Sequence, residues 1–106
     1  MAKYLVQASY TAEGVKGLLK DGGSGRRKVA TTLIESVGGT VESFNFAFGS
    51  SDAYLIVDMP DNASAAAASL AVNASGAVTT QITVLLTAEE VDAACKKSPA
   101  YRPPGS

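Results

Sequence analysis

The chain has 106 residues and a formal net charge of −1, and 46% of its residues are hydrophobic and 18% charged. This composition is too apolar for a disordered chain, and the near-neutral charge argues against a nucleic-acid binder, which needs a basic excess to displace counterions from phosphates. No apolar run approaches the roughly 20 residues of a membrane-spanning helix, so we expect a soluble domain with neither a nucleic-acid nor a membrane partner.

The first elements form a strand followed by a broken helix. Residues 3–10 alternate as a half-buried strand does, with Leu5, Gln7 and Ser9 on one face. Thr11 is a suitable N-cap for a short helix, which the glycine-rich segment 21–25 (DGGSG) should break. The helix then restarts over residues 26–37, and Gly38-Gly39 end it. Its apolar stripe consists of Val29, Leu33 and Val37, with Ala30 and Ile34 beside them.

The next segment predicts a β-hairpin. Residues 40–48 alternate strictly, so Phe44, Phe46 and Phe48 should share one face and Val41, Ser43, Asn45 and Ala47 the other. Gly49–Asp52 has turn chemistry, and the compact apolar run 53–59 should form the paired strand. The three phenylalanines are interpreted as core or interface residues that also shape a pocket.

The last third of the chain predicts a helix, a strand and a short final helix. Asp61 or Asn62 caps an alanine-rich helix that Gly76 ends, with Ala66, Leu70 and Ala74 on one side; small residues there imply a close approach to the sheet. Residues 78–86 alternate cleanly as a strand. Thr87 and Glu90 then form a capping box that opens a helix through Val91, Ala94 and Cys95.

The order of these elements predicts the fold. Strand, helix, strand, strand, helix, strand is the doubled βαβ unit of α+β ferredoxin-like folds, a four-stranded antiparallel sheet with both main helices on one face. We expect one domain over residues 1–97 and a proline-containing tail over 98–106. The opposite sheet face is too apolar to face water comfortably, so a second subunit should cover it; its side chains are Leu5, Gln7, Ser9, Gln81, Thr83 and Leu85.

Cysteine and histidine usage limits the chemistry. Cys95 is the one cysteine, so no internal disulfide forms, and its place on the apolar side of a short helix suggests packing. The start of the chain has no signal-peptide pattern, so we expect a cytoplasmic protein. With no histidine, the commonest general base and transition-metal ligand is missing, and we expect neither a metal site nor a cofactor.

Several segments together resemble the GYD-domain family. They are KYLVQASYTAEG at the start, GGSGRR before the long helix, the Gly49–Asp52 turn leading into YLIVDMPD, and TVLLTAEEVDAA near the end. The resemblance covers roughly residues 3–97 and implies ferredoxin-like subunits paired sheet to sheet as a dimeric α+β barrel, in a family whose members are largely of unknown function. Ser51 stands where the family's aromatic residue would be, and Tyr54 is a candidate for similar space.

The segment GGSGRRK is a candidate anion site. Flexible amides of Gly23, Ser24 and Gly25 meet the cations of Arg26 and Arg27 at the start of a helix, which suits a phosphate or carboxylate ligand. The segment lacks the spacing and preceding strand of a nucleotide-binding P-loop. A plain connector with a solvated or intersubunit basic patch is the alternative.

A second candidate set consists of strand and turn residues that could line a cavity. It comprises Tyr4, Tyr10, Asn45, Asp52, Tyr54 and Asp58. A phenol or carboxylate among them would act as an acid or base if burial shifted its pKa. The alternative is that the tyrosine rings pack and their hydroxyls form hydrogen bonds.

These observations leave three functional hypotheses. The preferred one is a non-enzymatic homo-oligomer, a dimer or larger, that binds a small anionic or amphipathic metabolite through Arg26, Arg27 and a partly aromatic pocket. The second is an enzyme of the cofactor-independent monooxygenase or isomerase type that uses Tyr10, Tyr54 or Asp52, an idea that rests on fold analogy. The third is a purely structural assembly unit with cations paired across subunits.

Overall fold

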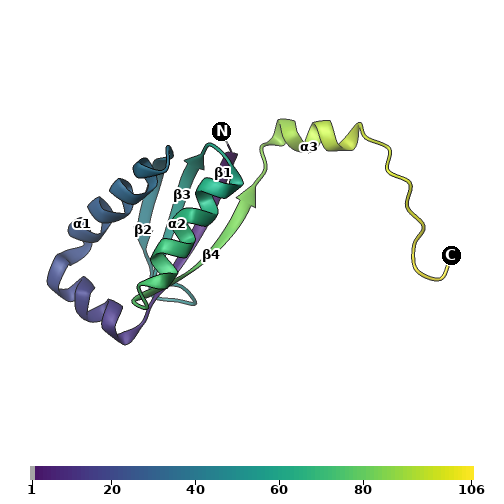
Figure 1. The fold of residues 1–106 in the computed structure, drawn as a ribbon. Helices are drawn as coiled ribbons and strands as arrows, with labels where there is room; N and C mark the ends of the chain where they lie inside the picture. The colour runs from purple at the N-terminus through teal and green to yellow at the C-terminus, as the bar shows by residue number, and fades with distance from the viewer. Residues whose placement is uncertain (1) are drawn as a thin grey trace.

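A computed structural model describes residues 2–106 and shows a four-stranded antiparallel sheet with α1 and α2 packed on one face (Figure 1). The elements in chain order are β1 Ala2–Tyr10, α1 Ala12–Ser36, β2 Thr40–Phe46, β3 Ala53–Met59, α2 Asn62–Ala74, β4 Val78–Leu85 and α3 Ala88–Cys95. The strands lie side by side in the order β2-β3-β1-β4. The predicted α+β ferredoxin-like arrangement is confirmed. No helix within residues 2–106 is both long and apolar enough to cross a bilayer.

The three predicted helix starts are confirmed by their caps. The Thr11 side chain accepts a hydrogen bond from the Gly14 backbone N–H, and the Asp61 carboxylate accepts one from the Ser64 N–H at 2.7 Å. Thr87 and Glu90 form the complete capping box at α3. Each cap satisfies an amide that the first helical turn leaves unpaired, which is why a local sequence pattern could predict it.

The N-cap of α2 gives a pH-dependent prediction. The hydrogen bond from the Ser64 backbone lowers the pKa of Asp61 below its ordinary value of 3.8, so the ionised carboxylate stabilises the fold above that pH. This contribution is lost as the pH falls through the lowered pKa. Asp61→Ala should therefore lower the unfolding midpoint at pH 7, and the difference from the parent should vanish in acid. Thermal unfolding between pH 7 and pH 2 would measure it, and Asp61→Asn, which keeps a capping oxygen, should lose little at pH 7.

The break in α1 is smaller than the sequence predicted. Only Gly22 leaves helical geometry, with φ of 76° and ψ of 166°, and the helix resumes at once. The expected five-residue break over 21–25 with a restart at Arg26 is therefore wrong in extent. Glycine adopts this left-handed φ without a Cβ clash, so one residue suffices to redirect the helix. The result is a kinked helix whose second part runs along the sheet (Figure 1).

β2 departs from strict alternation at a β-bulge. Val41 pairs with Val57 and Ser43 pairs with Ile56, which leaves Glu42 as the extra residue. Val41, Phe44 and Phe46 therefore share the helix-covered face, and the prediction that Val41 lies opposite the phenylalanines is wrong. The strand ends at Phe46, so Phe48 is fully exposed in the turn and does not belong to the core.

α2 packs through a different face from the one that the sequence suggested. Ala65 and Ala68 are buried against the sheet, whereas Ala66, Leu70 and Ala74 point to solvent. Alanine occurs on every side of this helix, so the apolar pattern did not distinguish its faces. The predicted close approach of small residues does occur, at Ala65 and Ala68.

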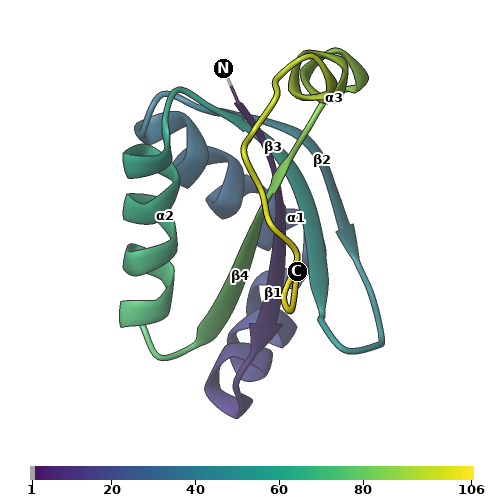
Figure 2. The ribbon, with the colours of Figure 1, turned by 90° about the vertical axis from the view of Figure 1, so that its right-hand side faces the viewer.

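Within residues 2–106, the outer sheet face and α3 remain uncovered. Leu5, Ile56 and Leu85 lie on the sheet face opposite α1 and α2, half-exposed among polar side chains, as the alternation predicted for Leu5 and Leu85. α3 lies beyond one end of the sheet in both views (Figure 1, Figure 2), and every one of its residues is exposed. The predicted packing of Cys95 is therefore wrong within this chain.

Candidate functional site

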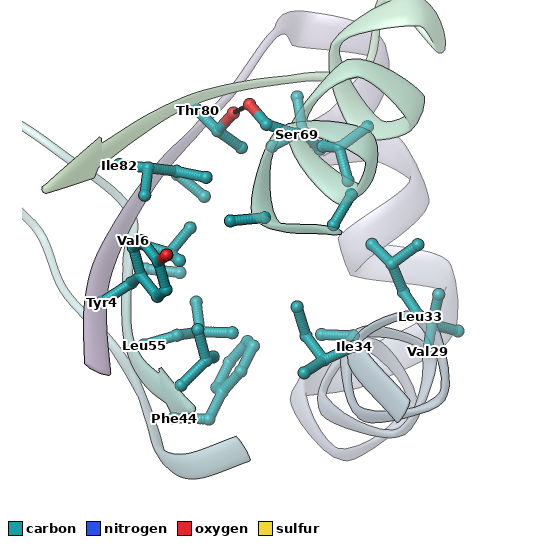
Figure 3. Close-up of a pocket in the computed structure, with 18 of the residues that line it drawn as sticks. Tyr4, Val6, Val29, Leu33, Ile34, Phe44, Leu55, Ser69, Thr80 and Ile82 are labelled. Carbon is teal, nitrogen blue, oxygen red and sulfur yellow. Dashed lines mark hydrogen bonds between the residues drawn. The ribbon is translucent and has the colours of Figure 1, made fainter. Parts of the chain in front are cut away.

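A cavity of about 120 Å³ lies between the sheet and the two main helices (Figure 3). Its floor is the inner face of β1, β3 and β4 with Phe44 of β2, and its walls are the facing sides of α1 and α2. Val29 and Leu33 of α1 belong to its lining and remain partly exposed, so the cavity is open to solvent beside α1. The lining is almost entirely aliphatic and aromatic, which is typical of small-molecule sites.

Small side chains account for the space. Ala8 and Ala53 on the floor lie below Ala30 of α1 and Ala65 and Ala68 of α2, all of them lining the cavity. Close-packed interiors place large side chains opposite small ones. Here alanines occur on both sides, so the gap between the helices is not filled by the chain itself.

Four of the polar side chains in the lining leave few free hydrogen-bonding groups. Ser69 Oγ and Thr80 Oγ1 lie 2.6 Å apart and satisfy each other, as the dashed line in Figure 3 marks. The buried Tyr4 donates its hydroxyl hydrogen to Asn62 Oδ1 at the start of α2. The hydroxyl of Tyr10 takes part in no hydrogen bond between the residues described here. Tyr4 therefore fits the structural alternative, while Tyr10 keeps an available phenol.

Among the described residues, Arg26 supplies the one charged side chain of the cavity lining. Its side chain is 29% exposed, and its Nη1 lies 3.7 Å from Oδ2 of Asp21, an ion pair too long for a hydrogen bond. A guanidinium carries five N–H donors in a planar fork. Most of these donors have no acceptor within the described part of the chain, and the side chain that carries them contributes to the lining of a largely apolar space.

The remaining residues of the predicted anion site do not join Arg26 in the cavity. Gly23, Ser24 and Gly25 belong to the helix, and a Cβ on Gly23 would meet the Phe46 ring at 3.1 Å. Arg27 is exposed and does not line the cavity. The glycines thus allow the kink and a close contact with Phe46. An anion site formed jointly by Arg26 and Arg27 stays a prediction, because only Arg26 of the two lines the cavity.

Asp52 has a structural place at the end of the hairpin. Its carboxylate Oδ2 accepts a hydrogen bond from the Tyr10 backbone N–H at 2.8 Å, and its own N–H donates to the Ala8 carbonyl at 2.8 Å. Its carbonyl also accepts from the Ala47 N–H. These bonds connect the end of β1 to the turn between β2 and β3 and so hold Tyr10 in position.

Tyr54, Asn45 and Asp58 lie on the other face of the sheet. Tyr54 pairs with Gln7 and Asn45, and Asp58 pairs with Lys3. Side chains of Ser50, first, and Gln7 lower the pKa of the Tyr54 phenol below its ordinary value of 10.0. Ser51 is buried beside it. The second candidate set is therefore divided between two faces.

Lys3 anchors the charged part of this second face. Its ammonium group pairs with Glu42 of the bulge and lies 3.3 Å from Asp58 Oδ1. The hydrogen bond to Glu42, followed by the contact with Asp58, raises the pKa of Lys3 above its ordinary value of 10.5. Neither this cluster nor Tyr54 reaches the cavity, since alternate residues of a strand point to opposite faces.

The sequence interpretation missed most of the cavity. Val6, Leu33, Leu55, Ser69 and Ile82 were interpreted as packing residues or not singled out, and all of them line it. The sequence did contain one indication of the cavity, the small residues of two helices and two strands that face each other between the sheet and the helices. That signal becomes specific only when the separation of α1 and α2 is known.

Comparison with known proteins gives one family. The GYD domain matches residues 4–95, which is nearly the whole chain from β1 to the end of α3. Neither the curated proteins nor the solved structures that were compared gave a match. The resemblance predicted from the strand, turn and capping segments is thus confirmed by a match over most of the sequence. The chain belongs to the GYD-domain family.

Proposed function

We propose that this protein is a homo-oligomeric, non-enzymatic module that binds a small amphipathic metabolite in the cavity between its sheet and its helices. The observation that carries the proposal is the apolar space of about 120 Å³ with one cation, Arg26, in its lining. An apolar cavity of comparable volume, about 150 Å³, can hold a single aromatic ring. A ligand with an apolar body and one polar end matches this arrangement.

The proposed site fits binding better than catalysis by the expected groups. Tyr10 lines the cavity, Asp52 is engaged by backbone amides at the hairpin, and Tyr54 lies on the opposite face of the sheet. An acid or base must lie within hydrogen-bond reach of the group that it protonates or deprotonates. These three residues therefore do not form one reaction centre within a single chain.

Filling the cavity tests the proposal. Val6 lies on the floor and points into the space (Figure 3), so Val6→Phe should occupy it and abolish binding of small aromatic compounds. Isothermal titration with toluene and 2-phenylethanol, together with far-UV circular dichroism, would measure binding and folding separately. The parent protein should bind at least one of these probes, and Val6→Phe should bind neither while it retains the parent's secondary structure.

A matched control uses the outer side of α2. Leu70 is exposed and lies outside the cavity lining, so Leu70→Phe adds the same ring without filling the space. This variant should bind like the parent. The proposal would be wrong if the parent bound neither probe, or if Val6→Phe and Leu70→Phe bound them equally well.

Self-association is the second part of the proposal, and two uncovered surfaces support it. Within residues 2–106, no helix covers the sheet face with Leu5, Ile56 and Leu85. α3 has only eight residues, which is too short to be stable alone in water, and its capping box specifies a helix that its own chain does not bury. A second copy that covers the sheet face and receives α3 would account for both. A purely structural assembly would share these surfaces but would leave the cavity without a ligand.

A further inference from the structure

We propose that the cavity selects a monocarboxylate whose apolar body is one aromatic ring or a branched alkyl group of similar bulk, with the carboxylate at Arg26. This inference rests on the proposed binding function and adds the chemical class of the ligand. It follows from the polar groups that line the cavity, the charge of Arg26 and the volume of the cavity.

The polar groups available to a ligand are few. Ser69 and Thr80 satisfy each other, and Tyr4 is bonded to Asn62. Among the residues described, the remaining polar side chains of the lining are Arg26 and Tyr10, neither of which has its side-chain donors occupied by a hydrogen bond. Arg26 can only donate, and the Tyr10 hydroxyl can donate as well as accept, so one acceptor group on a ligand could receive hydrogen bonds from both.

The charges at the cavity favour one negative charge on the ligand over two. Arg26 is the cation in the described lining, its neighbour Arg27 is exposed outside it, and the exposed Asp21, 3.7 Å from the Arg26 guanidinium, already offsets part of the positive charge. A dianion such as a phosphate monoester would bring a second charge into apolar surroundings without a second cation, which is costly. A carboxylate can accept two parallel hydrogen bonds from the guanidinium fork, and such charge-assisted pairs are about twice as strong as neutral ones.

The volume and the lining set the body of the ligand. The remaining wall residues, among them Val6, Leu33 and Leu55, have hydrocarbon side chains apart from the thioether of Met59, so additional hydroxyl or amide groups on the ligand would be buried without good partners. About 120 Å³ leaves room for one ring rather than for two. Arylacetate and branched-chain carboxylates match these limits, whereas nucleotides and sugars do not.

The test compares three probes that share one ring. Phenylacetate, 2-phenylethanol and phenyl phosphate differ in the polar end alone, and isothermal titration against the full-length protein would give their dissociation constants. We expect the parent to bind phenylacetate about tenfold or more tightly than 2-phenylethanol, and phenyl phosphate more weakly than phenylacetate. Arg26→Gln should remove the preference for the acid but retain binding of the alcohol.

The control is the neighbouring arginine. Arg27→Gln removes the same charge one residue away, outside the cavity, and should still bind phenylacetate more tightly than 2-phenylethanol. A long-range charge effect would instead weaken this preference in both the Arg26 and the Arg27 variants. Equal binding of phenylacetate by Arg26→Gln and the parent would overturn the carboxylate assignment, as would a parent that prefers the alcohol or the phosphate. If the parent bound none of the three probes, the proposed binding function itself would be wrong. If the parent bound 2-phenylethanol as tightly as phenylacetate, the binding function would stand and only the assignment of a carboxylate ligand would be wrong.

Discussion

Replacing Gly14 by alanine is expected to destabilise the protein by more than about 2 kcal/mol, although alanine is the better helix former. Gly14 is buried in the first turn of α1, where an added Cβ would stand 2.0 Å from the carbonyl oxygen of Ala77. That carbonyl accepts hydrogen bonds from the Thr11 backbone N–H at 2.9 Å and from the Thr11 hydroxyl at 3.2 Å. Relieving the clash would therefore disturb the contact that joins the start of α1 to the start of β4. Chemical denaturation followed by circular dichroism would measure the loss.

The matched control for this substitution lies one turn further along the same helix. Apart from the neighbouring residues and the backbone of its own helix, no atom lies within 4 Å of a Cβ placed on Gly17, so Gly17→Ala gains helix propensity without a clash. We expect it to stabilise the protein by about 0.5–1 kcal/mol. Similar effects of the two substitutions would mean that the backbones of α1 and β4 are further apart at this end than the structure places them.

Features encoded by a few neighbouring residues could be predicted from the sequence. The N-caps at Thr11, Asp61 and Thr87 depend on one side chain and an amide three residues later. The end of α1 depends on Gly38, which adopts a φ of 87°. Such contacts form within one turn of chain, so the local pattern contains the information. Together with the alternation of the strands they determined the order of elements and hence the fold.

Two kinds of feature could not be predicted: which face of a strand or helix a residue lies on, and how far apart two elements stand. One extra residue at Glu42 reverses the faces of the rest of β2, and nothing in an alternating stretch marks where a bulge is placed. The alanine-rich α2 has no face that is distinctly more apolar, so its rotation is fixed only by packing on the sheet. The cavity depends on both, because residues of α1, of α2 and of the sheet, Ala8 and Ala53 among them, line it together.

The candidate site shows the same division. Arg26 was selected for its place beside glycines and a second arginine, yet its position follows from the kink at Gly22, which directs the second part of α1 along the sheet. Tyr10 was selected as a strand aromatic and does line the cavity. Asn45 and Tyr54 were grouped with it, but the parity of their strand positions places them on the other face. The residue types in the sequence identified which side chains could act as acids, bases or ligand-binding groups. The strand register decided which of these side chains lie on the same face of the sheet.

Replacing Ile56 by lysine is expected to dissociate the oligomer into monomers. Ile56 is half-exposed near the middle of β3 on the uncovered sheet face, directly opposite Leu5 of β1. A face that associates through these side chains would have to bury the new ammonium group without a partner, which costs more than one such apolar contact contributes. The monomer itself should tolerate the change, because Ile56 faces solvent there and β3 keeps its buried side toward α1 and α2.

Sedimentation velocity at micromolar concentration would measure the dissociation. Leu70→Lys on the exposed side of α2 is the control, since it adds the same charge away from the sheet face. A parent protein that sediments as a monomer would contradict the proposed self-association, and dissociation by Leu70→Lys in place of Ile56→Lys would move the interface to α2.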